Sequence, residues 1–235
     1  MASPVSDPSL KSKLPASVIV GNTDSLIGTN LNGYVVSRLI AAGGMGLVYE
    51  ATHETIGRRA AVKVLKPEVA TDESWVKRFV TEARALAALK HRNLIEIINF
   101  GKTPDAREYL MMEFLEGEPL DAYMRRYGAL PPTVALGIAD QILNGLAEAH
   151  KKGVVHRDLK PSNIFLLHEH SGELLVKILD FGLARQEPIA MIDSVLPLPR
   201  STDGASLLAG TPEYIAPEQA RGLKAEGSAD LYSLG

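Results

Sequence analysis

The chain of 235 residues contains no cysteine. Disulfide bonds, thiolate nucleophiles and cysteine-based metal sites are therefore excluded. Long apolar runs are also missing, because no run approaches the roughly 18 to 20 residues that a membrane-spanning helix needs. The formal net charge is only −3, which gives no general attraction to nucleic acid or to anionic lipid. The start of the chain lacks the basic and then apolar pattern of a secretory signal. We therefore expect a soluble chain without a membrane segment and without nucleic acid as a partner.

Apolar residues make up 46% of the chain, which is enough for a sizeable core. A length of 235 residues suits one large domain or two small lobes. Residues 1–25 are rich in serine and proline and show no sustained period, so we expect a flexible N-terminal leader there. Residues 26–235 are expected to form the folded part of the chain.

A polar stretch of eight residues, His156–Asn163 (HRDLKPSN), lies between two short apolar runs. These runs cover residues 153–155 and 164–167, and both are typical of buried strands. Pro161 prevents an α-helix through the polar stretch. The pattern therefore predicts a loop held between two strands.

Three side chains of this loop carry groups that phosphoryl transfer requires. The Asp158 carboxylate can accept a hydroxyl proton, the Lys160 ammonium can stabilise the negative charge of a phosphate group, and the Asn163 carbonyl can bind a cation. Phosphoryl transfer depends mainly on positioning and on charge stabilisation, which these groups can supply. The alternative is a solvated turn with ordinary surface charges.

Glycines join two strand-like runs, Tyr34–Ile40 and Leu47–Ala51, and such a pattern predicts a hairpin. The joining segment contains Gly43, Gly44 and Gly46. Glycines let backbone N–H groups approach a polyphosphate closely, although an ordinary hairpin also uses them. A nicotinamide-binding oxidoreductase is disfavoured, because its dinucleotide-binding fold needs a helix rather than a strand after the glycines.

A predicted strand and a predicted helix follow the hairpin. The strand, Arg59–Leu65, has an apolar run that is interrupted by Lys63. The helix begins at the capping residues Asp72–Ser74 and carries apolar residues at three- and four-residue spacing as far as Lys90. Glu82 lies on or beside this apolar stripe, where an unpaired carboxylate would be costly to bury. The alternatives are an edge-strand lysine and an exposed helix carboxylate.

Further elements are expected along the rest of the chain. Strands are predicted at residues 94–100, 109–114 and 176–179, and helices at residues 120–127 and 131–152. The last strand runs into the triplet Asp-Phe-Gly at residues 180–182. Asn163 and Asp180 together supply hard oxygen ligands, which suit Mg²⁺ and disfavour soft metals.

These motifs resemble those of the eukaryotic-type (Hanks-type) serine/threonine protein kinases, and the residues within them are most similar to those of the bacterial branch. The matching segments are the HRDLKPSN loop, the glycine-rich hairpin with Gly43, Gly46 and Val48 in register, the Lys63 strand, the triplet at 180–182 and Gly210–Glu218. Ala41 stands where the family pattern has its first glycine. Thr211, together with Lys160, makes the resemblance one to serine/threonine rather than tyrosine kinases.

The resemblance implies an α+β, two-lobed protein-kinase-like fold. Residues of about 26–114 would form a small five-stranded antiparallel β lobe with one helix, and about 113–118 would form the hinge. Residues 119–235 would form a mainly α-helical C-lobe. Because the resemblance covers some three-quarters of a complete kinase domain, we expect this lobe to be incomplete and to expose apolar surface.

The resemblance also assigns roles to individual residues. Asp158 and Lys160 would be catalytic, Lys63 would bind the phosphates with Glu82 as its ion-pair partner, and Asn163 and Asp180 would bind Mg²⁺. The residues implied to hold ATP are Ala41, Gly43, Gly44, Gly46, Val48, Ala61, Lys63, Met112 (the gatekeeper), Glu113, Leu115 and Phe165. Composition alone would make the apolar members of this set core residues.

The implied activity is transfer of the ATP γ-phosphoryl group to Ser or Thr hydroxyls of protein substrates, in the cytoplasm. Autophosphorylation, dimerisation, and tethering to a membrane through a region after residue 235 are compatible with the resemblance. Residues 183–209 would be an activation loop with Ser194, Ser201, Thr202 and Ser206, and Arg157 would read a phosphate on it. The rival interpretation is a pseudokinase or nucleotide-binding interaction module, which Ala41 favours and the intact acidic and basic motif residues oppose.

Overall fold

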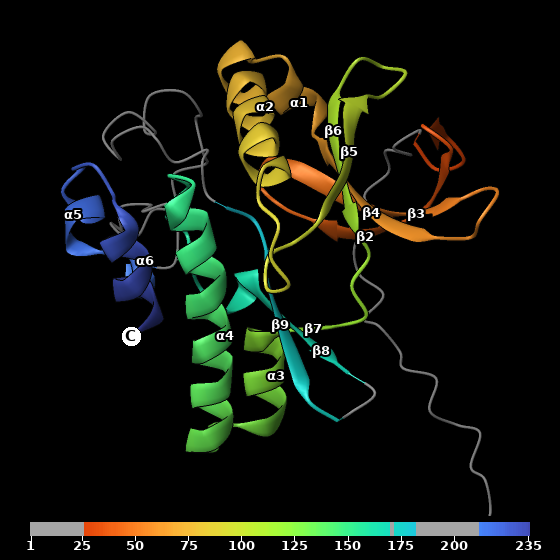
Figure 1. Ribbon diagram of the computed structural model, residues 1–235. Helices are drawn as coiled ribbons and strands as arrows, with labels where there is room; N and C mark the ends of the chain where they lie inside the picture. Colours follow the sequence, from red (N-terminus) through yellow and green to blue (C-terminus); the bar gives the residue numbers. More distant parts are fainter. Residues whose placement is uncertain (1–25, 170–171, 182–211) are drawn as a thin grey trace, which may run out of the picture.

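The structure is a computed structural model that describes residues 26–169, 172–181 and 212–235. Figure 1 shows a curled sheet with two helices packed on one side, above a second part that is built mainly from helices. The chain passes from the first part to the second once, near residue 115, as expected for a two-lobed α+β fold.

The first part contains a six-stranded antiparallel sheet with the strand order β1-β2-β3-β4-β6-β5. Its strands are β1 (Asn30–Leu31), β2 (Tyr34–Ala42), β3 (Gly46–His53), β4 (Arg59–Leu65), β5 (Ile97–Lys102) and β6 (Glu108–Glu113). The prediction of five strands is therefore wrong, because it did not include β1. This strand has only two residues, too few to show a period, and the left-handed backbone at Asn32 and Gly33 turns it onto β2.

Two helices connect β4 to β5, where the sequence predicted one. They are α1 (Pro67–Ala70) and α2 (Glu73–Ala87). The Asp72 carboxylate caps α2 by accepting a hydrogen bond from the Ser74 N–H at 2.8 Å. The apolar stripe of α2 is buried, and Glu82 is buried with it at 6% exposure. The sequence thus placed Glu82 on the correct face of the helix.

The second part combines helices with a small sheet that the sequence did not predict in full. Its helices are α3 (Leu120–Tyr127), α4 (Pro132–Lys151), α5 (Pro217–Ala220) and α6 (Gly227–Leu234), with 3₁₀ turns η1 (Pro161–Asn163) and η4 (Pro212–Tyr214). The small antiparallel sheet has the order β7 (Gly117–Pro119), β8 (Ile164–His168) and β9 (Leu174–Ile178). The strand predicted at 164–167 is confirmed as β8.

The strand predicted at residues 153–155 is wrong, because this segment closes the end of α4. The Gly153 N–H donates to the His150 carbonyl at 2.9 Å, and the Val154 N–H donates to the Ala149 carbonyl at 3.0 Å. This pair of bonds, with a left-handed Gly153, forms a Schellman cap. The apolar Val154 is buried by this cap instead of by strand pairing.

Two core clusters hold the fold together. One lies within the six-stranded sheet and includes Tyr49, Val62 and Met111. The other joins both parts of the molecule, because it contains Phe79 of α2, Leu146 of α4 and residues of β8 and β9. Full burial of a side chain of this size contributes about 2 kcal/mol relative to exposure. Helix α2 therefore contributes to the core that joins the two parts.

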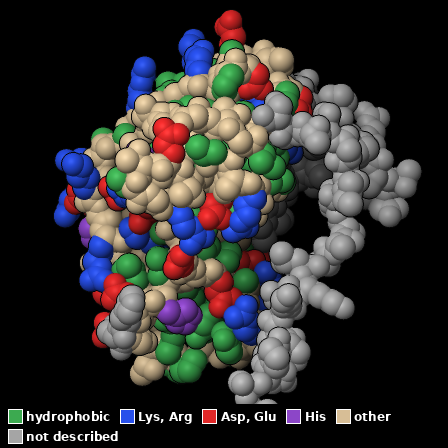
Figure 2. Space-filling view, turned by 90° about the vertical axis from the view of Figure 1, so that its right-hand side faces the viewer, with side chains coloured by type: hydrophobic (Ala, Val, Ile, Leu, Met, Phe, Trp, Pro, Cys, Tyr) green, Lys and Arg blue, Asp and Glu red, His purple; other side chains and the backbone are tan. Residues whose placement is uncertain are grey.

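The surface carries charges of both signs. On the face shown in Figure 2, Lys and Arg side chains lie interspersed with Asp and Glu side chains, without a large patch of one sign. Large apolar side chains are exposed on α4 (Leu136 and Leu143) and on α6 (Leu231 and Tyr232). Among the helices in residues 26–169, 172–181 and 212–235, none combines the length and apolar character needed to cross a membrane.

Candidate active site

The three predicted side chains of the polar loop lie together at its centre. The Lys160 Nζ atom lies 2.9 Å from Asp158 Oδ2. The Asn163 amide nitrogen donates to the Asp158 carbonyl at 2.8 Å, so its carbonyl oxygen is the group left to accept a cation. Pro161 starts the 3₁₀ turn η1 that carries Asn163 into this position. The structure thus brings the Asp158 carboxylate, the Lys160 ammonium and the Asn163 amide group together.

A buried carboxylate from α6 holds the backbone of this loop. Asp230 has no exposed surface, and its Oδ1 atom accepts the Arg157 N–H at 2.8 Å. Its Oδ2 atom accepts the His156 N–H at 2.8 Å and lies 2.7 Å from Nε2 of His150. Asp230 was not among the residues predicted for the site. The available signal was an acidic residue in a turn of otherwise small and apolar residues.

His156 connects the loop to the strand that ends at the triplet. Its side chain is fully buried, and burial lowers the pKa of the imidazole. The Nδ1 atom accepts the Asp158 N–H at 3.2 Å, so the proton is on Nε2, which donates to the Leu179 carbonyl at 2.8 Å. The ring also packs on Phe181 with a centroid distance of 4.7 Å. A neutral histidine therefore fixes the loop against the residues that flank Asp180.

Asn163 and Asp180 are brought next to each other by the backbone. The Leu179 N–H donates to the Asn163 carbonyl at 2.8 Å, which places the residue after Leu179 beside the loop. The described residues contain no cluster of three or more His, Asp or Glu side chains suited to a metal. One carboxylate and one amide oxygen fit Mg²⁺, which takes few protein ligands and completes its shell with water and substrate phosphates.

Lys63 of β4 reaches the same region from the sheet. Its Nζ atom lies 2.6 Å from Asp180 Oδ1, and this ion pair spans the two parts of the molecule. The positive charge of Lys63 lowers the pKa of the Asp180 carboxyl. Burial opposes the charge on Lys63, but the carboxylates of Asp180 and Glu82 outweigh it and raise the lysine pKa.

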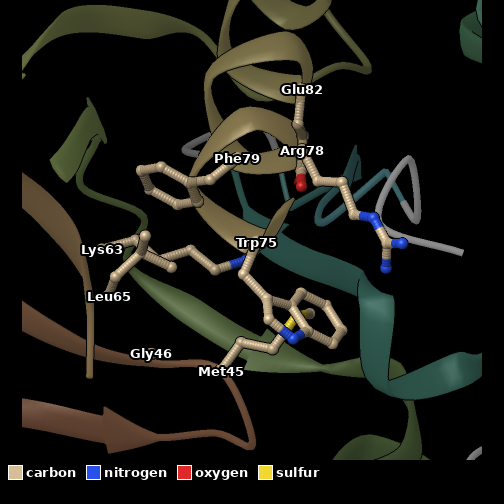
Figure 3. Close-up of a pocket in the computed structure, with 8 residues that line it drawn as sticks. All are labelled: Met45, Gly46, Lys63, Leu65, Trp75, Arg78, Phe79 and Glu82. Carbon is tan, nitrogen blue, oxygen red and sulfur yellow. The ribbon is translucent and has the colours of Figure 1, made fainter. Parts of the chain in front are cut away.

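Glu82 faces the same lysine from α2, and both residues line one pocket with Met45, Trp75 and Phe79 (Figure 3). Burial raises the pKa of Glu82 to about 7, although Lys63 acts in the opposite direction. Within the described residues, the ion pair of Lys63 is with Asp180 rather than with Glu82. The expected pairing is therefore not formed in this structure, since the lysine reaches across to the second part.

The glycine-rich segment closes over this pocket as the predicted hairpin. The Gly43 N–H donates to the Gly46 carbonyl at 2.9 Å, which forms the turn between β2 and β3. A Cβ atom at Gly46 would lie 2.8 Å from the Val64 carbonyl oxygen, so only glycine fits there. Gly43 and Gly44 are exposed, and Ala41 pairs with Val48 across the hairpin.

The predicted hinge residues follow the end of β6. Ala61 of β4 pairs with Met112 of β6, and Val48, Met112, Leu115 and Phe165 are all half-buried. The Glu113 N–H donates to the Glu96 carbonyl at 3.0 Å, so this N–H is already used within the protein. All of these predicted residues except Leu115 lie on strands, and Leu115 lies in the segment between β6 and β7 where the chain passes from the first part to the second.

Two cations hold the hinge, and neither belongs to a motif that would single it out in the sequence. Lys177 of β9 is buried and lies 2.6 Å from Glu113 Oε1, while it also donates to the Leu94 carbonyl at 3.2 Å. Arg59 of β4 stacks on the Phe114 ring at 3.7 Å and pairs with Glu116. Such contacts between residues far apart in the chain leave no local pattern.

The predicted activation loop, residues 183–209, lies outside the described residues, as do Gly182 and Thr211. The same holds for Ser194, Ser201, Thr202 and Ser206 and for the leader, residues 1–25. Arg157, the residue expected to read a phosphate, is described and has a left-handed backbone with a φ of 65°.

Comparisons with known proteins agree with this geometry. A family model described as "Protein kinase domain" matches residues 34–235. "Serine/threonine-protein kinase Pkn1" of Myxococcus xanthus is 40% identical over 217 residues, which are 92% of this chain and 30% of that protein. "Serine/threonine-protein kinase PknA" of Mycobacterium tuberculosis is 41% identical over 214 residues, which are 89% of this chain and 46% of that protein.

Solved structures show the same fold. The crystal structure of the Mycobacterium tuberculosis PknI kinase domain superposes with a TM-score of 0.66 at 29% identity. The match covers 88% of this chain and 73% of that domain. The chain thus spans less than half the length of the two curated relatives and about three-quarters of the solved domain.

Proposed function

This chain belongs to the protein kinase family, and we propose that it transfers the γ-phosphoryl group of ATP to Ser or Thr hydroxyls of protein substrates. One observation carries the proposal: Asp158, Lys160 and Asn163 are in contact in a loop that Asp230 anchors, and Lys63 and Asp180 pair beside it. Relatives named serine/threonine-protein kinases that are 37–41% identical over most of this chain give further support.

The loop residues would divide the chemistry between them. Asp158 would orient the substrate hydroxyl and accept its proton as the new bond to phosphorus forms. Lys160 lies 2.9 Å from Asp158 and would stabilise negative charge on the transferred group. The fixed backbone of the loop supports this assignment, because preorganised charges lose no energy to reorganisation during the reaction.

The nucleotide and its metal would lie between the two parts. Asn163 and Asp180 would hold Mg²⁺, which supplies charge neutralisation for the phosphates when bound. Lys63 and the backbone around Gly43, Gly44 and Gly46 would hold the phosphates, with Ala41 at the start of the loop. The base would lie between Val48 and Ala61 on one face and Phe165 on the other, with its edge against the backbone of Glu113 and Leu115. Met112 would be the gatekeeper.

Glu82 is proposed to hold Lys63 on the phosphates. Support comes from its position in the same pocket and from the opposing effect of Lys63 on the Glu82 pKa. In this arrangement Lys63 would exchange its contact with Asp180 for one with Glu82 when Asp180 binds the metal. The proposal therefore assigns Lys63 two partners: Asp180 before the metal binds and Glu82 once Asp180 holds the metal.

The wider setting follows from the same activity. We propose residues 26–235 as the kinase domain, with residues 1–25 as a leader and with Arg157 as the reader of a phosphate on residues 183–209. Protein substrates, and further copies of the chain in autophosphorylation or dimerisation, are the proposed partners. A cytoplasmic place of action is proposed because the reaction consumes ATP.

Substitution of Asp158 tests the assignment directly. In Asp158→Asn, we expect the rate of phosphate transfer from radiolabelled ATP to a generic protein acceptor to fall about 10²- to 10⁴-fold, the range for loss of a general base. Nucleotide affinity, measured by calorimetry, should stay unchanged. Asp121→Asn is the matched control, because Asp121 pairs with Arg125 on the surface of α3. Undiminished turnover in Asp158→Asn would refute the role of Asp158.

A pseudokinase that binds nucleotide and a protein partner is the second candidate. Two observations favour it: Ala41 replaces the first glycine of the phosphate loop, and Lys63 pairs with Asp180 instead of Glu82. The two functions differ in one measurement. A wild-type protein that binds nucleotide yet transfers no phosphate would establish the pseudokinase.

A further inference from the structure

We infer that Gln219 of α5 is a positioning residue for the proposed phosphoryl transfer, because it fixes the peptide bond that precedes Asp158. This inference rests on the proposed function and adds a residue to it. Gln219 lies outside the polar loop, 62 positions from Arg157 in the chain. No motif in the sequence connects the two residues.

The Gln219 side chain bridges α5 and the loop. Its Nε2 atom donates to the Arg157 carbonyl at 2.9 Å. Its Oε1 atom accepts the Ala216 N–H at 3.3 Å, so the same amide also holds the turn before α5. Both ends of the amide therefore have partners, and the direction of the donor is fixed.

The peptide between Arg157 and Asp158 is held at both of its polar atoms. Gln219 holds the carbonyl oxygen, and His156 Nδ1 accepts the Asp158 N–H at 3.2 Å. A change in the ψ angle of Arg157 would move the carbonyl oxygen together with the Asp158 Cα and its carboxylate. Loss of the hydrogen bond to the Arg157 carbonyl is therefore expected to change the orientation of the Asp158 carboxylate while the fold is retained.

Arg157 needs this restraint because its backbone is left-handed, with a φ of 65°. An L-residue other than glycine is disfavoured in this region, so the segment has a tendency to relax. Asp230 Oδ1 holds the N–H of Arg157 at 2.8 Å, and Gln219 holds its carbonyl. Of the two, Asp230 is completely buried, whereas Gln219 is half-buried and contributes one donor to the loop.

The same bond couples the loop to the segment around η4 and α5. The Ser233 hydroxyl of α6 donates to the Tyr214 carbonyl at 2.6 Å, which fixes η4 on the helix that also carries Asp230. Gln219 extends this framework to the loop from α5. The orientation of Asp158 thus depends on where α5 lies.

The chemistry of the amide supplies a test. In Gln219→Glu, an ionised carboxylate would face the Arg157 carbonyl with lone pairs only, whereas a protonated carboxyl could donate to it again. We expect the kcat of this variant to be about tenfold lower than that of the wild type at pH 8. The ratio of the two kcat values should return towards one as the pH is lowered to 5. Gln219→Met should be about tenfold slower at every pH, which corresponds to one lost hydrogen bond.

The matched control is Gln141→Glu on α4. Gln141 is also half-buried and donates to a backbone carbonyl, that of Leu174 at 2.9 Å, but it lies away from the loop. This variant should lose thermal stability without a pH-dependent recovery of kcat. Nucleotide affinity should be unchanged in both Gln219 variants, because the lost bond acts on Asp158 rather than on the nucleotide.

Failure of this inference is distinguishable from failure of the proposed function. A wild-type protein that transfers phosphate while Gln219→Met retains full kcat would overturn the role of Gln219 alone. A wild-type protein without transfer would overturn the proposed function. In that case, amide hydrogen exchange of residues 156–163 decides the positioning role: faster exchange in Gln219→Met than in wild type supports it, and equal exchange overturns it.

Discussion

Glu82 on α2 and Asp230 on α6 are both buried carboxylates, yet their surroundings differ. Glu82 is 6% exposed, and its strongest neighbours, Lys63 and Asp180, act on it through their charges. Asp230 has no exposed surface and lies within hydrogen-bonding distance of two backbone N–H groups and the ring of His150. Burial raises the pKa of Glu82 to about 7.

The comparison separates two uses of a buried acid. An acid with hydrogen-bond donors on both oxygens is a structural anchor, because moving it would leave several buried polar groups without partners. An acid that meets its neighbours mainly through their charges responds to those charges and to pH. Asp230 is of the first kind and holds the loop, whereas Glu82 is of the second kind and suits the proposed exchange of Lys63 between Asp180 and Glu82.

The largest effect is expected from breaking the anchor. In Asp230→Asn, one carboxylate oxygen becomes an NH₂ group that faces a backbone donor, so at least one buried N–H loses its acceptor. We expect the free energy of unfolding to fall by about 4 kcal/mol. Urea unfolding monitored by circular dichroism measures this change. Asp140→Asn is the control, because Asp140 is exposed on α4 and accepts one bond from Asn144. Equal stabilities of the two variants would contradict the anchoring role.

A somewhat smaller effect, dependent on pH, is expected for Glu82→Gln. The folded state raises the Glu82 pKa from 4.5 to about 7, so between these pH values it binds a proton that the unfolded state has released. Stability is therefore lost as the pH rises through this window, by about 3 kcal/mol in total. The variant should remove this loss.

Unfolding curves at several pH values between 4 and 8 test this expectation. The stability of Glu82→Gln relative to wild type should increase with pH across the window and then stay constant. Glu68→Gln, on the exposed face of α1, is the control and should show no such trend. A stability difference that stays flat over the whole range would show that Glu82 does not titrate there.

The smallest effect is expected from crowding the anchor at its edge. A Cβ atom at Gly227 would lie 2.8 Å from His150 Nδ1, so Gly227→Ala should displace the ring that contacts Asp230. We expect a loss of about 1 kcal/mol, typical of mild overpacking. Gly137→Ala on α4 is the control, because nothing lies within 4 Å of its Cβ position. That change should stabilise the helix by about 0.8 kcal/mol. Thermal unfolding distinguishes the two, and a Gly227→Ala variant as stable as Gly137→Ala would contradict the crowding.

Much of the architecture was predictable because its signals are local. Pro131 and Pro132 at one end and Gly153 at the other bounded α4, and the structure places this helix at Pro132–Lys151. The grouping of Asp158, Lys160 and Asn163 was predictable for the same reason, since all three lie within six residues of one turn. Short sequence separation leaves few conformations that would keep them apart.

The parts that were not predictable depend on distant contacts. Residues 153–155 have the composition of a strand, but a Schellman cap of α4 uses their backbone groups first. Lys63 has two carboxylates within its reach, and the sequence cannot show that the side chain selects Asp180, 117 positions away. Asp230 lies more than 70 positions from His156 and Arg157, whose N–H groups donate hydrogen bonds to its carboxylate.

The left-handed backbone at Arg157 and Asp180 places stability and chemistry in competition. Each side chain in that conformation costs about 1–2 kcal/mol, and glycine would relieve most of it. Glycine would also remove the guanidinium of Arg157 and the carboxylate of Asp180. Glycine at these two positions would therefore favour thermal stability, whereas the proposed reaction requires both side chains.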